Sequence, residues 1–579
     1  MATKKFINEP DSVVDDALQG LVKTNRNLRF HPSCKRVLLR IDYGEHVANG
    51  KIVLLAGGGS GHEPFAIGFI GKGLLTGAIC GDVFASPPSN HVLAALEETR
   101  GEAGTVLFVI NYTGDRLNFG LAAEKFKKSG GKVRVVVIAD DIALENVENR
   151  IGSRGLAAAT LIMKVAGAMT EAGKSLDEIA DYAEKLNGRC ATLGVSLYPC
   201  SLPNRPPMFE LEQGKMEVGL GIHGEPGKSR EDLRPARGII PLMMDTIIGS
   251  QAVTNHQNHP LILLLNNLGS VSQIEMGILR GEIVNYIMDL KQEVSLFYQG
   301  TFMSSLDGKG ISITAMRADD QVIKYLEFAT DAEAWPRAFP GSAFNSFEQR
   351  LPDRVEDEKQ MIERKGATLR KEEADLVKKC VQSACHALIE KRDFLNDLDG
   401  AAGDGDCGQT MAHAAKCILE ANESLHWQNP ASLLSQLAAI FQETVGGTGG
   451  AIYALLLEAA SGSFEESAHP ENWSHGLEIG LKAITEYGRA QPGDRTMVDT
   501  LHAVVDYMKR GSSFTNSQTI KEIGEIAKKA AESTATMKAS AGRASYTAEA
   551  VQTKPDAGAM AASIWIGAIC QKINGQISK

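Results

Sequence analysis

The hydrophobic pattern of this 579-residue chain changes once, near Lys371. Before that residue, short apolar runs rich in β-branched side chains alternate with amphipathic stretches, and this alternation is typical of an α/β fold with largely parallel sheets. After it, strands almost vanish and apolar residues recur with helical spacing, which predicts roughly eight helices in an all-α bundle. The sequence therefore predicts a multidomain protein, with an N-terminal α/β part followed by an all-α part.

The individual elements follow from the same patterns. Strands are expected at residues 52–55, 105–110, 133–138, 216–221, 261–265 and 311–316, with helices at 118–129 and 156–172 among them. In the second half, helices are expected at residues 372–391, 410–420, 432–445, 450–460, 476–487, 498–509, 520–537 and 558–574.

A segment between these two halves has neither pattern. It holds Pro336, Pro340 and Pro352, followed by a dense charge run over residues 353–365, and this composition indicates a solvated linker. We therefore expect an α/β domain over residues 9–336, a linker over 337–370 and an all-α domain over 371–574.

Bulk properties exclude several classes of protein. A net charge of −11 argues against nucleic acid as a main ligand. Nine cysteines without a CxxC pair indicate reduced thiols and a cytoplasmic protein. No apolar run is long enough to cross a bilayer, and the first residues show no secretory signal, so no membrane association is expected.

The run Gly57-Gly58-Gly59-Ser60-Gly61-His62-Glu63-Pro64 follows an apolar strand. Glycines at the end of a strand let the backbone approach a ligand closely, and His62 beside them can move protons. Taken alone, this run is better explained as a glycine-rich turn with a solvated histidine, and the later segments shift that balance.

Two further segments offer reactive side chains. Asp115, in Asn111-Tyr112-Thr113-Gly114-Asp115, follows a predicted strand and is placed to act as a base, although a helix cap is the simpler local interpretation. His223 lies between glycines in Gly221-Ile222-His223-Gly224-Glu225, where a neutral imidazole has room to act as a nucleophile or base. Toward a small carbonyl compound it could form a carbinolamine-like adduct, and a polar turn is the equal alternative.

The most specific local motif is a cluster of three aspartates. Asp399, Asp404 and Asp406 fall within eight residues and are separated by glycines, which favours a divalent cation over a solvated turn because clustered carboxylates repel each other. Further loops suited to anions are GGTGG over residues 446–450, PGDRT over 492–496, GRASY over 542–546 and PDAG over 555–558, each of which could also be a structural cap.

In identity and in order, these motifs resemble those of the dihydroxyacetone kinase family. The matching segments GGGSGHEP, NYTGD, GIHGEPG, LDxxxGDGDxG, PGDRTM and GRASY extend over nearly the whole chain. Fusion of both halves in one chain resembles the ATP-dependent animal members, and it argues against the bacterial type that takes phosphate from a phosphotransferase system.

The resemblance implies specific roles in the first half. This half would be the substrate (K) domain, made of two α/β subdomains. His223 would bind the ketone covalently as a hemiaminal, which excludes glycerol because glycerol has no carbonyl. His62 and Asp115 would position and deprotonate the hydroxyl that receives the phosphate. Gly59, Ser60 and Gly61 would contact the substrate through the backbone.

For the second half the resemblance implies a nucleotide (L) domain, an eight-helix barrel. Asp399, Asp404 and Asp406 would hold the Mg²⁺ that bridges the phosphates of ATP. The implied nucleotide contacts are Asp404, Gly405, Asp406, Cys407, Thr448, Gly449, Arg495, Thr496, Asp556, Ala557 and Gly558.

The sequence departs from the family pattern in three places. Ile110 stands where the family often has a lysine just before NYTGD, which removes a positive charge near the substrate. Gly449 stands where a serine is expected in the anion loop. Ala557 replaces the proline of PDPG, which is a milder change.

The resemblance implies phosphorylation of dihydroxyacetone and glyceraldehyde by ATP. It also implies a second activity of the animal members, which split FAD into AMP and riboflavin cyclic 4′,5′-phosphate with Mn²⁺ or Co²⁺. A homodimer is implied, with K and L domains meeting across chains. The alternative is a catalytically weakened relative that binds and restrains a cytosolic RNA-sensor helicase.

Overall fold

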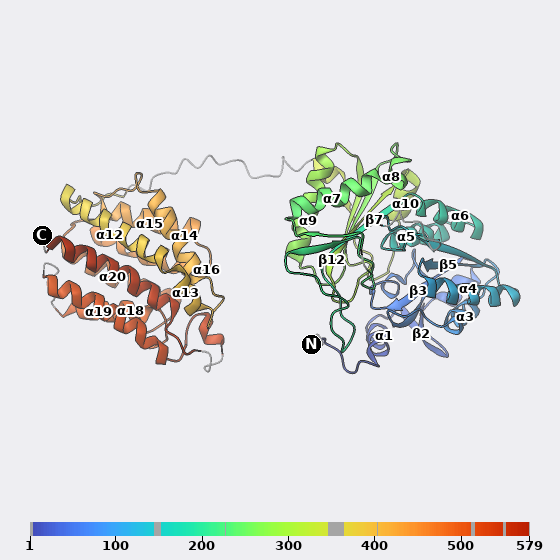
Figure 1. The fold of residues 1–579 in the computed structure, drawn as a ribbon, viewed down its shortest axis with the longest axis horizontal. Helices are drawn as coiled ribbons and strands as arrows, with labels where there is room; N and C mark the ends of the chain where they lie inside the picture. Colours follow the sequence, from blue (N-terminus) through green and yellow to red (C-terminus); the bar gives the residue numbers. More distant parts are fainter. Residues whose placement is uncertain are drawn as a thin grey trace. The chain divides into compact units, whose positions relative to one another are not determined.

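The computed structural model describes residues 4–143, 152–225, 227–345, 364–401, 403–510, 516–547 and 552–577. The chain divides into two compact units, Met1–Pro352 and Asp353–Lys579 (Figure 1). The first unit is α/β and the second is helical, so the predicted fold class is confirmed.

The first sheet of the N-terminal unit has six strands in the order β1-β2-β4-β3-β5-β6. The strands β4, β3, β5 and β6 are parallel to one another, whereas β2 pairs antiparallel with both β1 and β4. Their bounds are β1 Leu28–His31, β2 Cys34–Arg40, β3 Val53–Ser60, β4 Gly77–Val83, β5 Thr105–Ile110 and β6 Val133–Ile138. The helices of this region are α1 Val13–Thr24, α2 Tyr43–Ala48, α3 Ser89–Glu98, α4 Thr113–Lys128, α5 Ala158–Glu171 and α6 Leu176–Asn187.

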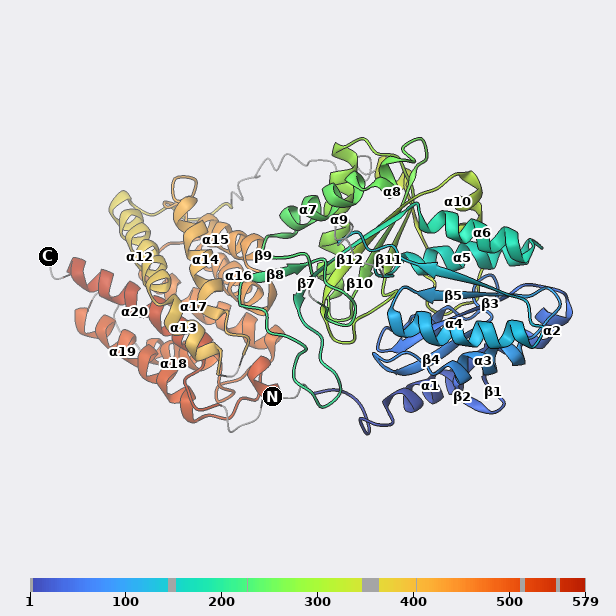
Figure 2. The ribbon, with the colours of Figure 1, turned by 45° about the vertical axis from the view of Figure 1, so that its right-hand side comes forward.

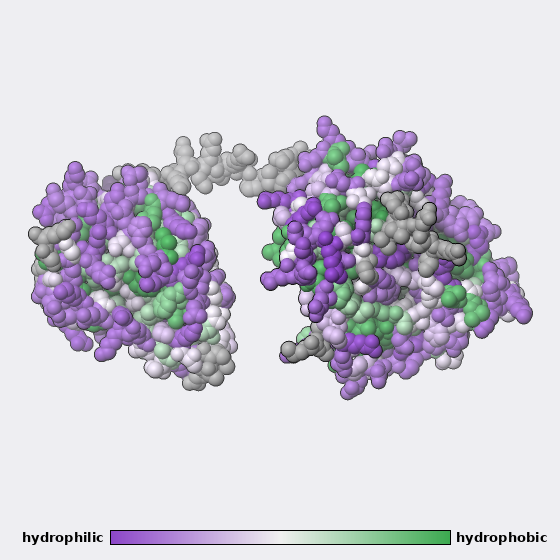
Figure 3. Space-filling model, viewed as in Figure 1, coloured by the Kyte–Doolittle hydropathy of each residue, from purple (hydrophilic) through white to green (hydrophobic). Residues whose placement is uncertain are grey.

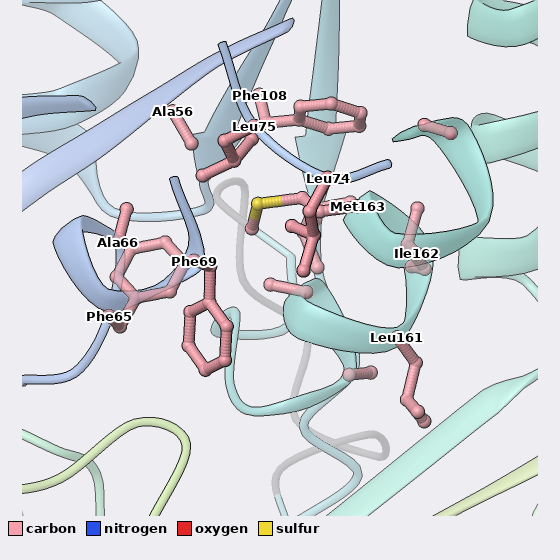
Figure 4. Packing of buried hydrophobic residues seen from close by; sticks show 14 of the residues in the cluster. Ala56, Phe65, Ala66, Phe69, Leu74, Leu75, Phe108, Leu161, Ile162 and Met163 are labelled. Carbon is pink, nitrogen blue, oxygen red and sulfur yellow. The ribbon is translucent and has the colours of Figure 1, made fainter. Parts of the chain in front are cut away.

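Helices cover both faces of this sheet, with α3 and α4 on one side and α5 and α6 on the other (Figure 2). Alternate residues of β3 face opposite ways, so that Val53 and Leu55 pack toward α3 and α4 while Leu54 packs toward α5. Figure 4 shows the α5 side, where Phe108 and Phe69 lie close to Met163. Burial of both faces explains why β5 is apolar at every position after Thr105.

The second sheet has seven strands in the order β13-β11-β10-β12-β7-β8-β9. Only β10 and β11 are parallel among its neighbouring pairs, so the prediction of largely parallel sheets is wrong for this half of the unit. The parallel pair is joined through helix α9, whereas β7, β8 and β9 follow one another without a helix, and such connections suit antiparallel neighbours. The strands are β7 Cys190–Tyr198, β8 Lys215–Val218, β9 Ser229–Asp232, β10 Leu261–Asn267, β11 Val294–Gly300, β12 Lys309–Arg317 and β13 Phe339–Pro340, and the helices are α7 Ala236–Gly249, α8 Gln251–Thr254, α9 Gln273–Asp289, α10 Asp320–Glu327 and α11 Ser342–Asn345.

The predicted strands are present, but others were missed. The bounds of β5 and β6 match the prediction, while the strand expected over 216–221 ends at Val218, where Gly219 takes a positive φ. Strands such as β4, with the sequence GAICGDV, escaped prediction because glycine and aspartate are unfavourable in strands and only the neighbouring strands stabilise them.

The C-terminal unit is a closed ring of eight helices. In packing order these are α12, α14, α15, α16, α17, α18, α19 and α20, and α20 packs back against α12. Their bounds are α12 Lys371–Glu390, α14 Cys407–Glu420, α15 Pro430–Thr444, α16 Gly447–Ser461, α17 Pro470–Gly488, α18 Met497–Lys509, α19 Ser517–Ser533 and α20 Ala557–Ile577. The predicted eight-helix bundle is thus a barrel, with the short helix α13 (Arg392–Asp399) inserted before α14.

Both ends of the predicted linker are structured. Near its start, Phe339 and Pro340 form β13, which pairs with β11. Near its end, the N–H groups of Ala367 and Leu369 donate to the carbonyls of Phe464 and Gln428. Short stretches at both ends of this proline-rich and charged segment therefore have backbone partners. The middle of the predicted linker, residues 346–363, lies outside the described residues.

Hydrophilic residues cover much of the face of each unit in Figure 3. In the part of the chain that the structure describes, no helix combines the length and apolarity needed to span a membrane. All nine cysteines are free thiols.

Candidate active site

The glycines at the end of β3 let neighbouring segments pack closely. A Cβ on Gly57 would lie 2.2 Å from the carbonyl oxygen of Ile79 on β4, and one on Gly61 would lie 2.8 Å from the ring of Phe84. The φ of Gly61 is +99°, which favours glycine. The sequence predicts that these glycines allow close approach of a ligand, but at these two positions the protein's own packing requires glycine.

The three expected substrate contacts next to His62 have partners within the protein. The Ser60 hydroxyl donates to the carbonyl of Gly81 at 2.8 Å, and the Gly61 N–H donates to the Glu63 carboxylate at 2.8 Å. A Cβ on Gly59 would lie 2.8 Å from the backbone of the segment that follows β4. Their contact with a substrate therefore stays a prediction.

His62 is buried and its protonation state follows from its partner. Its Nδ1 lies 2.8 Å from the carbonyl oxygen of Ser304, which can only accept, so Nδ1 carries the proton. Its Nε2 then holds a lone pair and has no hydrogen-bond partner among the described residues. Burial, with a contribution from His223, lowers the pKa of His62 to about 3, so the ring is a neutral acceptor near neutral pH.

Asp115 lies in the first turn of α4 and is 7% exposed. The Ser86 hydroxyl donates to its carboxylate at 2.5 Å, and a Cβ on Gly58 would lie 3.7 Å from that carboxylate. Gly58 therefore keeps space open in front of Asp115. Burial raises the pKa of Asp115 to about 6, against the opposing effects of Ser86 and His223, which makes this carboxylate a stronger base than an exposed one.

His223 lies in the turn after β8 and is oriented by Glu225. Its Nδ1 is 2.9 Å from one carboxylate oxygen, and its backbone N–H donates to the other at 3.0 Å. Burial opposes ionisation of Glu225, but its bond to His223 and the charge of that ring lower the pKa of Glu225 to about 2. An ionised carboxylate only accepts, so Nδ1 carries the proton and Nε2 is left with a nucleophilic lone pair.

Aromatic rings from other segments surround this histidine. The ring centroids of His62 and Tyr112 are both 4.6 Å from that of His223, and that of Phe84 is 5.1 Å away. The open surroundings that flanking glycines suggested for His223 are therefore wrong, because distant parts of the chain enclose the ring. The structure places His62 and His223 in contact and brings Asp115 close enough for the charge of His223 to affect its pKa.

In the C-terminal unit, the predicted acidic loop joins α13 to α14. Asp399, Asp404 and Asp406 offer carboxylate oxygens that lie within 4.8 Å of one another. Asp399 also accepts the N–H groups of Asp406 and Cys407 at 3.0 and 3.2 Å, which orients its carboxylate at the start of α14. Three oxygen donors so close together fit a hard divalent cation such as Mg²⁺.

A cavity of about 130 Å³ adjoins this loop. Asp399, Arg495, Thr496, Asp556 and Ala557, predicted from three separate segments, all line it, and Gly542 and Ala544 of the GRASY segment do so as well. By contrast, Thr448 and Gly449 are exposed at the start of α16 and are not among its described lining residues.

Several predicted nucleotide contacts also have structural roles. The Thr496 hydroxyl accepts the N–H of Val498 and so caps α18, and Asp556 caps α20 by accepting the N–H of Ala559 at 2.8 Å. Burial raises the pKa of Asp556 to about 6 despite the nearby charge of Arg495. The cap interpretations left open by the sequence are thus correct for these positions, and they leave the cavity side of each residue available.

Arg495 is the buried cation of this cavity. It is 2% exposed, has a φ of +62° and donates from Nη2 to the carbonyl of Lys554 at 2.8 Å, while its Nε has no partner among the described residues. Cys407, at the start of α14, is a poor candidate for a thiolate ligand, because burial and three neighbouring aspartates raise the pKa of its thiol to about 12. Gly405 has a φ of +79°, and Gly558 lies beside the Asp556 carboxylate.

Comparison with known proteins agrees with this division. A Dak1 domain model matches residues 19–334, and a DAK2 domain model matches residues 401–571. The chain belongs to the dihydroxyacetone kinase family. Within this family it is 39% identical to the triokinase/FMN cyclase of Mus musculus, over 100% of both chains.

Solved structures of this family show the same architecture. The crystal structure of the native dihydroxyacetone kinase of C. freundii is 31% identical, with a TM-score of 0.67, and the alignment covers 99% of this chain and 100% of that one. The complex of the same enzyme with AMP-PNP and Mg²⁺ is 30% identical, with a TM-score of 0.66, over 98% of this chain and 100% of that one.

Sequence reasoning missed several residues of the first site. Glu225 could have been identified from the sequence, because it stands two residues after His223 in the same motif. The same holds for Tyr112, which lies in one motif with Asp115. No local pattern pointed to Phe84, Ser86 or Ser304. These three come from connections after β4 and β11, and only the folded chain brings them to the histidines.

Proposed function

We propose that this protein is a kinase that transfers the terminal phosphate of ATP to dihydroxyacetone and glyceraldehyde. The observation that carries the proposal is the Nδ1 bond from His223 to Glu225, which leaves Nε2 free to attack a carbonyl carbon in an aromatic-walled site beside a second neutral histidine. In this scheme residues 9–336 bind the substrate, residues 337–370 link the two domains, and residues 371–574 bind the nucleotide.

Covalent capture is the first step assigned to the chain's own residues. The Nε2 lone pair of His223 forms a bond to the carbonyl carbon, and the carbonyl π electrons move to oxygen, which takes up a proton. The Nδ1 proton faces the Glu225 carboxylate, which stays ionised because its pKa is low and so balances the positive charge that the ring gains. Only carbonyl compounds can form this hemiaminal, so alcohols such as glycerol are excluded by their chemistry.

Proton removal from the accepting hydroxyl is assigned to Asp115. With a pKa raised to about 6 it is a better base than His62, whose pKa is lowered to about 3. We assign to His62 the acceptance of a hydrogen bond at Nε2, which orients the hydroxyl. Gly59, Ser60 and Gly61 are assigned backbone contacts with the substrate.

Nucleotide binding is assigned to the C-terminal unit. Mg²⁺ held by Asp399, Asp404 and Asp406 would offset the negative charge of the phosphates. Arg495 supplies a fixed positive charge beside the cavity. The further assigned contacts are Gly405, Cys407, Thr448, Gly449, Thr496, Asp556, Ala557 and Gly558.

The test of this function is direct. Purified protein with Mg-ATP and dihydroxyacetone is expected to form dihydroxyacetone phosphate, which phosphorus NMR would detect. The same protein should leave glycerol unreacted. Product formation would also show that Ile110, buried in the core at the end of β5, is compatible with activity. Absence of product from folded protein that binds Mg-ATP would contradict the proposal.

The pH dependence of this reaction follows from Asp115. Because its raised pKa means that it binds a proton below about pH 6, kcat/KM is expected to fall about tenfold per pH unit below that value and to level off above it. In Asp115→Asn this dependence should vanish and kcat/KM should drop on the order of 10²–10⁴-fold. A wild-type profile that stays flat down to pH 5 would remove Asp115 as the base.

A second activity is favoured by full-length similarity to proteins named triokinase/FMN cyclase. We propose that the C-terminal unit also cleaves FAD to AMP and riboflavin cyclic 4′,5′-phosphate, with Mn²⁺ or Co²⁺ at the same three aspartates. Chromatography of FAD incubated with each metal tests this. The alternative of an inactive protein that binds an RNA-sensor helicase is not favoured, because both histidines and all three aspartates are in place.

We also propose a cytoplasmic homodimer, in which the substrate domain of one copy works with the nucleotide domain of the other. The free thiols support the compartment. Co-expression of a variant defective only in the first unit with one defective only in the second tests the arrangement. If domains meet across chains, each mixed dimer has one intact site of two and about half of the dimers are mixed, so the co-expressed population should recover about a quarter of wild-type activity; it should recover none if domains meet within one chain.

A further inference from the structure

Arg154 is a buried cation next to the His223 turn that the proposed mechanism does not use. Its side chain is 13% exposed. Nε and Nη2 both lie 2.7 Å from the same carboxylate oxygen of Asp141, and Nη2 donates to the carbonyl of Gly219 at 2.6 Å. Asp141 lies directly beyond the first sheet and Gly219 opens the His223 turn, so this one guanidinium ties the turn to the sheet region.

The remaining nitrogen of this guanidinium, Nη1, lies near the Glu225 carboxylate but beyond direct ion-pair contact with it. A Cβ built on Gly221 would lie 2.6 Å from Nη1 of Arg154 and 2.1 Å from a carboxylate oxygen of Glu225. Both atoms thus crowd the same point above the Gly221 Cα, and they are near neighbours of opposite charge. A side chain at position 221 would therefore displace one or both of these groups.

Glu225 in turn determines the state of His223. One of its oxygens accepts the Nδ1 proton and the other accepts the backbone N–H of the same residue. Loss of this orientation would let the imidazole rotate or change tautomer, and the lone pair would no longer face the substrate. Residues that orient a reacting histidine in this way commonly carry a large part of a site's function.

We propose that Arg154 is a positioning residue for covalent substrate capture, acting through the chain Asp141–Arg154–Glu225–His223. The inference rests on the proposed kinase function and adds a determinant outside the substrate contacts. Arginine suits this role because its planar fork binds Asp141 and Gly219 through Nε and Nη2 while Nη1 lies near Glu225, whereas the single ammonium of lysine cannot reach all three.

The other charged and titratable groups around this chain fit the same arrangement. Burial raises the pKa of Asp141 to about 6, but the Arg154 charge opposes that rise and favours the ion pair. Burial raises the pKa of Tyr112, whose ring contacts His223, well above its usual value, and the charges of Glu225 and Arg154 also affect this pKa. Tyr112 therefore stays neutral and adds no competing anion.

The test compares Arg154→Met and Arg154→Lys with a matched control. The control, Arg189→Met, removes a similarly buried arginine that pairs with Asp319 at 3.5 Å, away from the His223 turn. Each variant is mixed with dihydroxyacetone labelled with ¹³C at the carbonyl, and the hemiaminal carbon signal is measured in the full-length protein. Steady-state kinetics then separate kcat from KM, and thermal unfolding checks the fold.

Arg154→Met is expected to lose most of the hemiaminal signal and to raise KM for dihydroxyacetone about 10–100-fold, with a smaller change in kcat. Arg154→Lys should recover only part of that loss, and Arg189→Met should retain wild-type signal and KM. If Arg154→Met does not fold, Arg154→Lys, which keeps the charge, carries the comparison.

Two outcomes would overturn the inference while leaving the kinase intact. One is a wild-type hemiaminal signal and KM in folded Arg154 variants. The other is an equal loss in Arg189→Met, which would mean a general packing defect. If the wild-type protein itself shows neither hemiaminal nor product, the proposed function fails and the inference fails with it.

Discussion

Replacing His223 by alanine is expected to abolish phosphorylation of dihydroxyacetone while leaving FAD cleavage unchanged. The substitution removes Nε2, the atom assigned to form a covalent bond to the substrate, so the ketone would be held by hydrogen bonds alone. Holding a reactant in the correct geometry is worth a factor of about 10⁵–10⁸ in model reactions, so a loss of at least about 10³-fold in kcat/KM is a conservative expectation.

The two activities should respond differently because they use different parts of the chain. Cleavage of FAD, as proposed, needs only a hydroxyl of FAD itself and the acidic loop of the C-terminal unit, and His223 lies in the other unit. The measurement is therefore a pair of assays on one preparation, with phosphorus NMR for the kinase and chromatography for FAD. His256→Ala, which removes a histidine of the α8–β10 connection, is the control.

Equal loss of both activities in folded His223→Ala protein would contradict this separation of roles. Retention of kinase activity would contradict the covalent mechanism, and His62, with its unpartnered Nε2, would become the next candidate for the substrate-binding histidine. Loss of the carbon signal of the hemiaminal in the variant, measured as for Arg154, links the kinetic effect to the bond itself.

Replacing Asp406 by asparagine should lower both activities together. The change keeps the size of the side chain but removes one of three negative charges from a cluster whose oxygens lie within 4.8 Å. Changing a residue that only orients a metal ligand lowers metal affinity or activity about 10–100-fold, so loss of a direct ligand should lower activity at least about 100-fold. Half-saturation in Mg²⁺ should move to higher concentration by a similar factor.

Asp393→Asn is the matched control for the acidic loop. It removes a carboxylate from α13, the helix that leads into the acidic loop, but that carboxylate pairs with Arg392 on the surface. Both activities and the Mg²⁺ dependence should be those of the wild type. Full activity of Asp406→Asn at low Mg²⁺, or loss of only one of the two activities, would show that this carboxylate does not hold a metal common to both reactions.

The acidic loop was predictable because its geometry is local. Asp399, Asp404 and Asp406 are close in sequence, and glycines let the loop fold back, so a short stretch of chain is enough to bring their oxygens together. Helical periodicity likewise predicted the barrel helices, because one face of each contributes to a single core. The bounds of β5 and β6 were predictable because both are short runs dominated by β-branched and other apolar residues, which favour strands.

The substrate site could be predicted only in part. His62, Asp115 and His223 were identified from their own motifs, but what each can do depends on neighbours from elsewhere. Ser304 and Glu225 decide which nitrogen of each ring carries the proton, and burial moves the pKa of Asp115 toward neutrality. Protonation depends on solvent exclusion and on partners, and these exist only after folding.

The sequence by itself determined the family, the order of the two units, the acidic loop and the identity of the side chains proposed to react, because each depends on residues that are neighbours in the chain. The tertiary structure alone decided the antiparallel pairing of the second sheet, the aromatic enclosure of His223 and the Asp141–Arg154–Glu225 chain behind it. The physical reason is that strand pairing, burial and buried ion pairs join residues far apart in the sequence, and no local periodicity encodes such contacts.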